Sequence, residues 1–142
     1  MYKTACSVAE IKRAGDEKGL GVFALQDIPE GWVVEVSPVV LIEGDFESLP
    51  VAIQNRVFAW GNLSGLGSPE HALALGWGGM FNHGNPASLR YCADPYAGAL
   101  IFTAVRAIRR GEELTINYNL SSGDHISTED TWFADRNIRR VD

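Results

Sequence analysis

The sequence predicts a single domain built mainly of β-strands. Its 142 residues match the usual length of one domain, and 46% apolar with 21% charged residues is ordinary for a folded, soluble protein. Fifteen glycines outnumber six prolines, and short valine-rich runs recur between them, which favours turns and short strands over a helical bundle. An internal repeat points the same way, because Ala24–Gly31 and Ala104–Gly111 carry alanine, isoleucine and glycine at the same spacing. Each unit predicts strand, tight turn and strand, with the isoleucine in the core and the glycine at positive φ.

The strand signals follow one another along the chain. We expect strands over residues 20–25, 32–36, 39–42, 89–92, 100–105 and 113–118. Pro38 divides the second run from the third, which are two strands or one strand broken at a sheet edge. Residues 47–55 predict a short helix, and residues 56–60 fit either that helical face or a strand. Residues 61–70 are rich in Gly, Ser and Asn and predict a loop.

The charge of the chain is unevenly placed. The net charge is -6 and the pI is ≈ 5.0, so no broad basic surface for a phosphate backbone exists and no direct nucleic-acid binding is expected. Between Gly19 and Leu89, Arg56 is the only Lys or Arg. The same stretch holds seven acids, Asp27, Glu30, Glu35, Glu43, Asp45, Glu47 and Glu70. These acids are either solvated loops or a surface that attracts a cationic partner.

Cysteine usage and hydropathy indicate a cytoplasmic protein. Cys6 and Cys92 lack paired spacing, so they form neither a disulfide framework nor a metal site, and we expect them to be packing residues in a reducing compartment. The N-terminus lacks the apolar stretch of a secretory signal. No run reaches the ~18 apolar residues that span a bilayer, so no membrane association is expected.

Three short motifs carry candidate chemistry. Gly19–Ala24 fits the pattern G-x-G-x-x-G/A, which indicates a dinucleotide loop only if a helix follows, and is otherwise a glycine-flanked loop that lies close to a ligand. The pair Asn82 and His83 lies in tight backbone and, taken alone, fits a turn in which the asparagine caps its own backbone. Gly111–Tyr118 predicts a strand that ends in Tyr118, which alone fits a core tyrosine.

Together, and in this order, the three motifs resemble the SET domain, a family of S-adenosylmethionine-dependent protein lysine methyltransferases. The resemblance runs from Lys18 to Tyr118 and more loosely to Trp132. It implies a SET-type knotted β-clip with short helices, in which the Asn-His segment and the tyrosine segment pass through one another. The implied division is an N-terminal lead-in at 1–17, the SET domain at 18–120, and a C-terminal segment at 121–142 that forms a lid over the cofactor.

The resemblance also implies a role for each motif. Tyr118 is expected to be the catalytic tyrosine and to touch the cofactor, with its hydroxyl close to the transferred methyl group and the incoming amine. Asn82 and His83 are expected to hold the adenine and amino-acid portions of the cofactor, largely through backbone. Main-chain contacts on the other side of the cofactor are expected from Lys18, Gly19 and Leu20.

Two aromatic residues complete the expected site. Tyr91 is expected to line the substrate channel that admits the lysine. Trp132 is expected either to stack on adenine as part of the lid or to pack in the core.

The resemblance implies an enzyme that uses S-adenosyl-L-methionine and acts on a lysine-rich protein, which the acidic stretch would favour. No metal is expected, because the cysteine-rich zinc-binding tail of many members is absent. Three positions depart from the family pattern: Gly84 replaces a serine, Asn117 replaces an aspartate, and Val36-Ser37-Pro38 stands near the place of a Tyr-x-Gly element. These departures motivate an alternative, a non-catalytic SET-like module that binds a protein or the cofactor. The substrate, the number of methyl groups added and the oligomeric state stay open.

Overall fold

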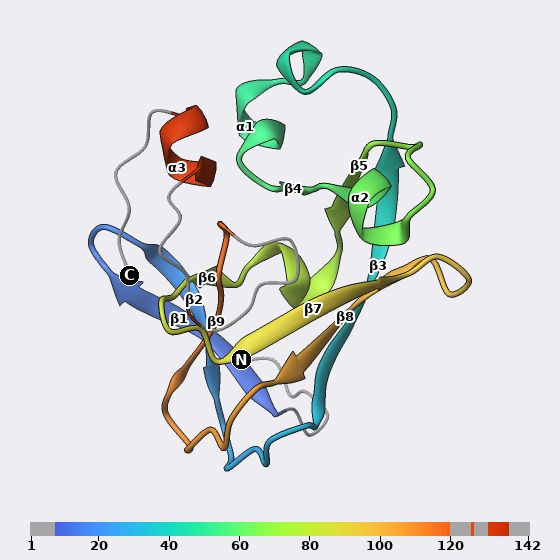
Figure 1. The fold of residues 1–142 in the computed structure, drawn as a ribbon. Helices are drawn as coiled ribbons and strands as arrows, with labels where there is room; N and C mark the ends of the chain where they lie inside the picture. The colour runs from blue at the N-terminus through green and yellow to red at the C-terminus, as the bar shows by residue number, and fades with distance from the viewer. Residues whose placement is uncertain (1–7, 120–125, 127–130, 137–142) are drawn as a thin grey trace, which may run out of the picture.

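Two curled sheets form the framework of the molecule (Figure 1). The structure, a computed structural model, describes residues 8–119, 126 and 131–136. The four-stranded sheet has the order β1-β2-β9-β6, and its strands are β1 (Ala9–Gly15), β2 (Gly19–Ala24), β9 (Glu113–Ile116) and β6 (Asn82–His83). The five-stranded sheet has the order β4-β5-β3-β8-β7, and its strands are β4 (Val57–Phe58), β5 (His71–Ala74), β3 (Val33–Ile42), β8 (Ala99–Ala104) and β7 (Leu89–Asp94).

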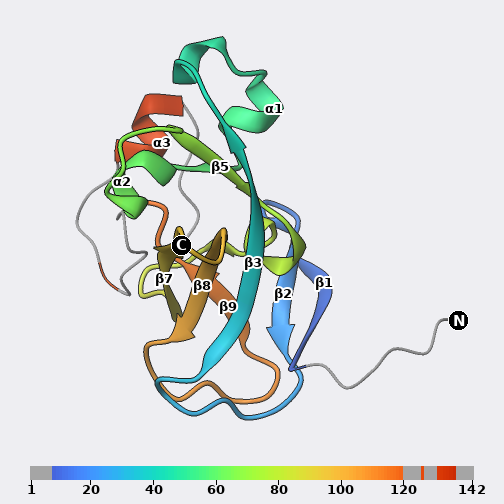
Figure 2. The same ribbon diagram turned by 90° about the vertical axis from the view of Figure 1, so that its right-hand side faces the viewer.

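The helices α1 (Val51–Gln54), α2 (Trp60–Ser64) and α3 (Thr131–Arg136) lie at one end of these sheets, as Figures 1 and 2 both show. The described residues also form two short 3-10 helices, η1 (Phe46–Ser48) and η2 (Gly76–Gly79). Within the described residues, no helix is both long and apolar enough to cross a membrane. The predicted mainly β class with short helices is therefore confirmed.

The repeated turn units lie together at the opposite end of the molecule (Figure 2). Ile28 and Ile108 donate their N–H groups to each other's carbonyl oxygens, both at 2.8 Å, and both side chains are buried. Gly31 and Gly111 have φ of +86° and +91°, and each donates its N–H to the alanine that opens the other unit, at 2.9 and 2.8 Å. The two units thus form a reciprocal pair that joins the end of β2 to the end of β8, as their shared pattern predicts.

Pro38 does not break β3, and the prediction of an edge strand is wrong. β3 is one continuous strand between β8 and β5. Its first part, Val33 to Pro38, pairs with β8, while residues 39–42 pair with β5. Pro38 lies where β3 changes partner, so its missing N–H costs little, and its carbonyl still accepts the N–H of Leu75 at 2.8 Å.

The segment between β3 and β5 also differs from its prediction. The single helix expected at 47–55 is divided into η1 and α1 at Leu49-Pro50, because a residue before proline disfavours the helical conformation. The loop expected at 61–70 begins as α2, which is anchored by the buried Trp60. A Cβ at Gly61 would collide with the backbone of Gly67, so this close approach is what the glycine permits.

β7 alternates between the core and solvent, and this alternation places Tyr91 inward and Cys92 outward. Cys92 is exposed, so its prediction as a packing residue is wrong, and Cys6 lies outside the described residues. The core around Tyr91 includes Phe102, which is fully buried, and Phe58, whose ring centroid lies 5.0 Å from that of Tyr91. This packing therefore fixes the Tyr91 ring at the edge of the core.

Candidate active site

The order of the four-stranded sheet brings the three motifs side by side. β9 pairs antiparallel with β2, through Val22 opposite Leu114, and parallel with β6, through Asn82 opposite Thr115. Residues more than 60 positions apart in the chain therefore meet at one place. β2 is followed by a turn and not by a helix, so a dinucleotide loop at Gly19–Ala24 is excluded.

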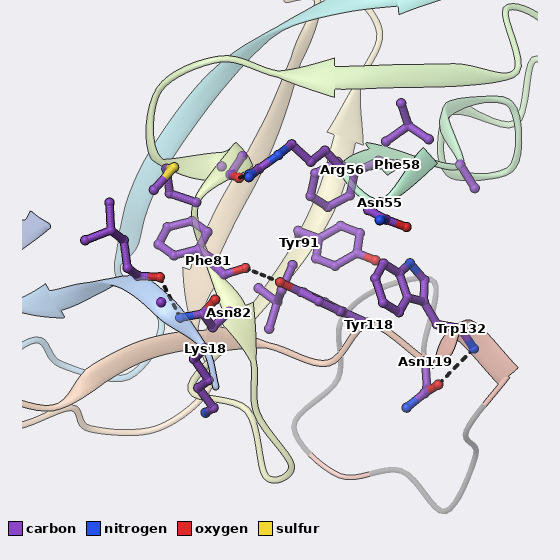
Figure 3. Close-up of a pocket in the computed structure, with 18 residues that line it drawn as sticks. Lys18, Asn55, Arg56, Phe58, Phe81, Asn82, Tyr91, Tyr118, Asn119 and Trp132 are labelled. Carbon is purple, nitrogen blue, oxygen red and sulfur yellow. Dashed lines mark hydrogen bonds between the residues drawn. The ribbon is translucent and has the colours of Figure 1, made fainter. Parts of the chain in front are cut away.

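A cavity of about 470 Å³ opens where these strands meet the helical end (Figure 3). Of the eight residues predicted for the site, seven line it: Lys18, Gly19, Leu20, Asn82, Tyr91, Tyr118 and Trp132. His83 does not line the cavity and is 3% exposed. The structure thus brings the predicted residues together, with His83 one layer behind them.

Tyr118 is held by hydrogen bonds at both ends. Its hydroxyl donates to the carbonyl oxygen of Phe81 at 2.7 Å, as Figure 3 shows, and its backbone N–H donates to Nδ1 of His83 at 3.1 Å. Because the phenolic proton is committed to Phe81, the free lone pairs of the oxygen are available to a ligand. Burial raises the pKa of Tyr118 to about 12, with Glu113 also raising it and the positive charge of Arg56 lowering it.

His83 supports Tyr118 from behind. Its ring lies 5.4 Å from the Tyr118 ring and 4.8 Å from that of Phe133, between centroids. Because Nδ1 accepts the Tyr118 N–H, that nitrogen carries no proton. The side chain of His83 is therefore part of the support of Tyr118, and its backbone, through the carbonyl that faces Lys18 at 3.3 Å, lies nearer the predicted cofactor side.

A polar network fixes the start of β2. The amide nitrogen of Asn82 donates to the carbonyl oxygen of Leu20 at 2.9 Å and to Oε2 of Glu113 at 2.8 Å. Nζ of Lys18 lies 3.7 Å from the other carboxylate oxygen of Glu113. Gly21 lies against this network, because a Cβ there would come within 2.6 Å of Glu113 and 2.9 Å of Asn82. Sequence reasoning missed Glu113, although it stands in the quoted tyrosine motif.

Aromatic rings form the other wall of the cavity. Phe58 meets Tyr91 edge to face, and both side chains line the cavity with Phe81. Burial raises the pKa of the Tyr91 hydroxyl well above its usual value, and the nearby Tyr118 adds to this effect. This wall is suited to an apolar chain with a polar end, since it combines aromatic rings with tyrosine hydroxyl groups.

The C-terminal helix closes the cavity on a third side. The N–H of Trp132 donates to Oδ1 of Asn119 at 3.1 Å, and the Trp132 ring lies 4.7 Å from the Tyr118 ring (Figure 3). Phe133 is buried beneath it. Nδ2 of Asn119 is buried and has no hydrogen-bond partner among the described residues, although Asn119 lines the cavity. A ligand that accepts a hydrogen bond would satisfy this group.

Arg56 also lines the cavity, and the sequence analysis did not assign it to the site. One terminal nitrogen of its guanidinium donates to the carbonyl oxygen of Gly79 at 3.3 Å. The signal was present in the sequence, because Arg56 is the single cation in an acidic stretch of some seventy residues, from Gly19 to Leu89. The pairing of β4 with β5, which the sequence does not encode in any local pattern, brings it to the cavity.

Comparison with known proteins identifies the family. A model of the SET domain matches residues 19–119. The chain belongs to the SET domain family. The chain is also 31% identical over 126 residues to a Schizosaccharomyces pombe protein named "Histone-lysine N-methyltransferase, H3 lysine-37 specific", with 87% of this chain and 76% of the relative covered. The predicted family is thus confirmed, and with it the assignment of this SET domain to the protein-lysine methyltransferases.

Solved structures share the fold. A Plasmodium falciparum protein described as a candidate histone methyltransferase matches with a TM-score of 0.62 and 23% identity, covering 80% of this chain and 95% of that one. A humanised mutant of the Chaetomium thermophilum Polycomb Repressive Complex 2 matches with a TM-score of 0.57 and 18% identity, covering 84% of this chain and 16% of that one. At these identities the likeness supports the SET fold alone, and the threading of one segment through the other stays a prediction.

Proposed function

We propose that this SET domain transfers a methyl group from S-adenosyl-L-methionine to a lysine side chain of a basic protein. The observation that carries the proposal is the Tyr118 hydroxyl, whose proton is committed to Phe81 and whose oxygen lies in a cavity bounded by two unlike walls. One wall is polar and built on Lys18 and Asn82. The other is aromatic and built on Phe58 and Tyr91. A sulfonium nucleotide suits the first wall and a lysine side chain suits the second.

Two features of the cavity fit the cofactor. A Cβ at Gly19, which has φ of +71°, would meet no atom within 4 Å, so the backbone there is open to close approach. The buried Nδ2 of Asn119 lacks a partner among the described residues and would donate to a nucleotide acceptor. The residues that would hold the cofactor are Lys18, Gly19, Leu20, Asn82, the backbone of His83, Tyr118, Asn119 and Trp132. A cavity of about 470 Å³ is also within the usual range for a ligand of this class.

The chemistry requires a neutral amine and an aligned methyl group. When bound, S-adenosylmethionine would supply a methyl group on a positive sulfur, and a neutral lysine amine aligned with it would accept that methyl as the C–S bond breaks and an amine proton is released to solvent. Free lysine has a pKa near ~10.4, so the aromatic wall of Phe58 and Tyr91 must disfavour the ammonium by excluding water. The lone pairs of Tyr118 would orient the methyl group through weak C–H···O contacts.

The charge of the chain supports a basic substrate. Arg56 opposes seven acids between Gly19 and Leu89. Three of the acids, Glu43, Asp45 and Glu47, lie around η1, which leads through α1 to the cavity residues Asn55 and Arg56. A lysine-rich tail would be attracted to this end of the molecule. Since the fission-yeast relative is named for a histone H3 lysine, we propose a histone-like tail as the substrate class.

Binding and transfer test the proposal separately. S-adenosylhomocysteine is expected to raise the melting temperature of the purified protein, because it would bind the native state alone. Radiolabelled S-adenosylmethionine with histone H3 is expected to label the histone, and Tyr118→Phe is expected to abolish most of the label. Tyr96→Phe is the matched control, since Tyr96 is fully exposed and is not among the described residues that line the cavity. Undiminished labelling by Tyr118→Phe would contradict the mechanism, and a melting shift without label on any lysine-rich protein would favour the binding module.

A further inference from the structure

The cavity holds one positive charge that has no ion-pair partner among the described residues. Lys18 and Arg56 are the two cations among its described lining residues. Lys18 is compensated, since its Nζ lies 3.7 Å from the Glu113 carboxylate and 3.3 Å from the carbonyl oxygen of His83. Arg56 makes no ion pair with any described residue, and its guanidinium donates to the neutral carbonyl oxygen of Gly79 at 3.3 Å.

The other ionisable groups around the cavity do not cancel this charge. Tyr118 and Tyr91 have raised pKa values and stay neutral near pH 8. From β9, Glu113 is shared between Lys18 and Asn82. From β3, Glu35 accepts the Trp77 N–H at 2.8 Å and lies behind η2, outside the described lining.

The remaining described polar residues around the cavity also present neutral groups to it. On β6, His83 accepts the Tyr118 N–H at Nδ1 and does not line the cavity. Asn55, just after α1, and Asn119, a few residues after β9, contribute uncharged amides to the cavity lining. Among the described residues, the guanidinium of Arg56 is therefore the charge at the cavity that lacks an ion-pair partner.

We propose that Arg56 is an electrostatic positioning residue, whose fixed positive charge disfavours the ammonium form of the target lysine in the cavity and so increases the fraction of neutral amine. This inference rests on the proposed function. The reason is Coulombic: a second positive charge in the same cavity is repelled by the guanidinium, while a neutral amine is not. The contact with Gly79 keeps the guanidinium at the wall of the cavity, although Arg56 also touches solvent.

The effect of Arg56 on a neighbouring group supports this role. Its charge lowers the pKa of the Tyr118 phenol, in opposition to the larger effect of burial. A group that stabilises a phenolate at this place would destabilise an ammonium beside it, because both effects favour loss of a proton. Arg56 also acts without touching the reacting atoms, so its influence is expected on the pH dependence of the reaction.

Two substitutions separate charge from shape. Arg56→Lys keeps a cation and a donor for the Gly79 carbonyl, whereas Arg56→Gln keeps a donor and removes the charge. The measurement is the single-turnover rate of methyl transfer to a histone H3 tail peptide between pH 6.5 and 10, at saturating S-adenosylmethionine. We expect the apparent pKa of the acid limb of the pH–rate profile to rise by about half a unit to one unit in Arg56→Gln. Below that pKa the rate would be about three- to tenfold slower than in the unsubstituted protein, while the plateau at high pH would be equal. Arg56→Lys is expected to keep the limb of the unsubstituted protein.

Three outcomes would overturn the inference or its basis. An acid limb that does not move in Arg56→Gln would refute the electrostatic role. A variant with an unmoved limb and weaker S-adenosylhomocysteine binding by calorimetry would instead make Arg56 a cofactor contact. If the unsubstituted protein neither binds S-adenosylhomocysteine nor transfers methyl groups, the proposed function itself fails. Melting temperatures within about 2 °C of the unsubstituted protein are the folding control, which the solvent exposure of Arg56 makes attainable.

Discussion

The amide of Asn82 ties the start of β2 to β9, and its removal is the most informative single perturbation. Its nitrogen donates to the Leu20 carbonyl at 2.9 Å and to the Glu113 carboxylate at 2.8 Å, so both amide protons are already used within the protein. Asn82→Ala therefore acts on cofactor binding through the position of the Lys18–Leu20 backbone. We expect it to lower stability and cofactor affinity together.

The size of the effect follows from the two bonds. A hydrogen bond to a charged acceptor contributes about 1.5–3 kcal/mol, and one to a neutral carbonyl about 0.5–1.5 kcal/mol. The Glu113 side chain is 17% exposed, so the lower ends of both ranges apply and Asn82→Ala is expected to cost about 2 kcal/mol of folding free energy. Glu113→Ala removes one of the same bonds together with the contact to Lys18. The two substitutions should therefore couple by about 1 kcal/mol in a double-mutant cycle.

Urea unfolding of the two single variants and the double variant measures this coupling, and calorimetry with S-adenosylhomocysteine measures its effect on affinity. Asn62→Ala is the matched control, because Asn62 is an exposed asparagine on α2 and its loss should change stability by less than about 0.5 kcal/mol. If the Asn82 and Glu113 effects add within about 0.3 kcal/mol, the network does not act as a unit and the reasoning is refuted. Unchanged affinity in Asn82→Ala would remove that residue from the cofactor side.

Three further predictions concern stability. The folded pKa of Tyr118 is about 12 and the unfolded value is near 10, so the stability that Tyr118 contributes is fully present below pH 10 and is lost as pH rises through 12. In urea unfolding, the stability lost between about pH 9 and pH 11 should therefore be smaller for Tyr118→Phe than for the unsubstituted protein. Gly84→Ser should destabilise by about 1–3 kcal/mol, because the side chain of Thr115 occupies the space of a Cβ; an unchanged urea midpoint would contradict this packing. Ile28→Ala and Ile108→Ala should each lower the free energy of unfolding in urea by about 2–4 kcal/mol. Equal losses would fit their reciprocal burial, whereas a loss below about 1 kcal/mol at either position would contradict it.

The sequence predicts the strands well because their signals are local. β2, β7, β8 and β9 carry β-branched or aromatic residues between turn residues, and each lies within a residue or two of its expected bounds. The reciprocal turns were also predictable, since the isoleucine and glycine needed at each turn are fixed by the turn itself. The family could be predicted because three motifs, each ambiguous alone, constrain one another by order and spacing.

Other parts of the fold depend on contacts between distant segments. Pro38 is accommodated because β3 exchanges β8 for β5 at that residue, which no local pattern states. α2 forms in a Gly-rich stretch because Trp60 is buried and Gly61 approaches Gly67. Arg56 reaches the cavity through the pairing of β4 with β5, so its charge was visible in the sequence while its position was not.

The departures from the family pattern do not by themselves favour a non-catalytic module. At Gly84, Thr115 fills the place of a side chain, and its hydroxyl oxygen accepts the Ser88 N–H at 3.2 Å. Asn117 is fully buried, and its Oδ1 accepts a hydrogen bond from the backbone N–H of Asn119 at 3.0 Å. An aspartate could accept the same hydrogen bond, but its negative charge would then be buried at an added free-energy cost. The hydroxyl of Ser37, near the place of the Tyr-x-Gly element, accepts the Gly78 N–H at 3.0 Å.

None of these three residues lines the described cavity, and each has an intramolecular partner or a neighbour that fills its space. The three departures therefore change packing and the positions of η2 and β9, and they affect the reaction only through Tyr118. A binding module would need a change at the phenol or at the aromatic wall, yet Tyr118, Tyr91 and Phe58 are present and in contact with the cavity. The distinction between enzyme and module thus depends on whether the unsubstituted protein transfers methyl groups at all, and not on the three altered positions; Tyr118→Phe then tests the role of the phenol in that transfer.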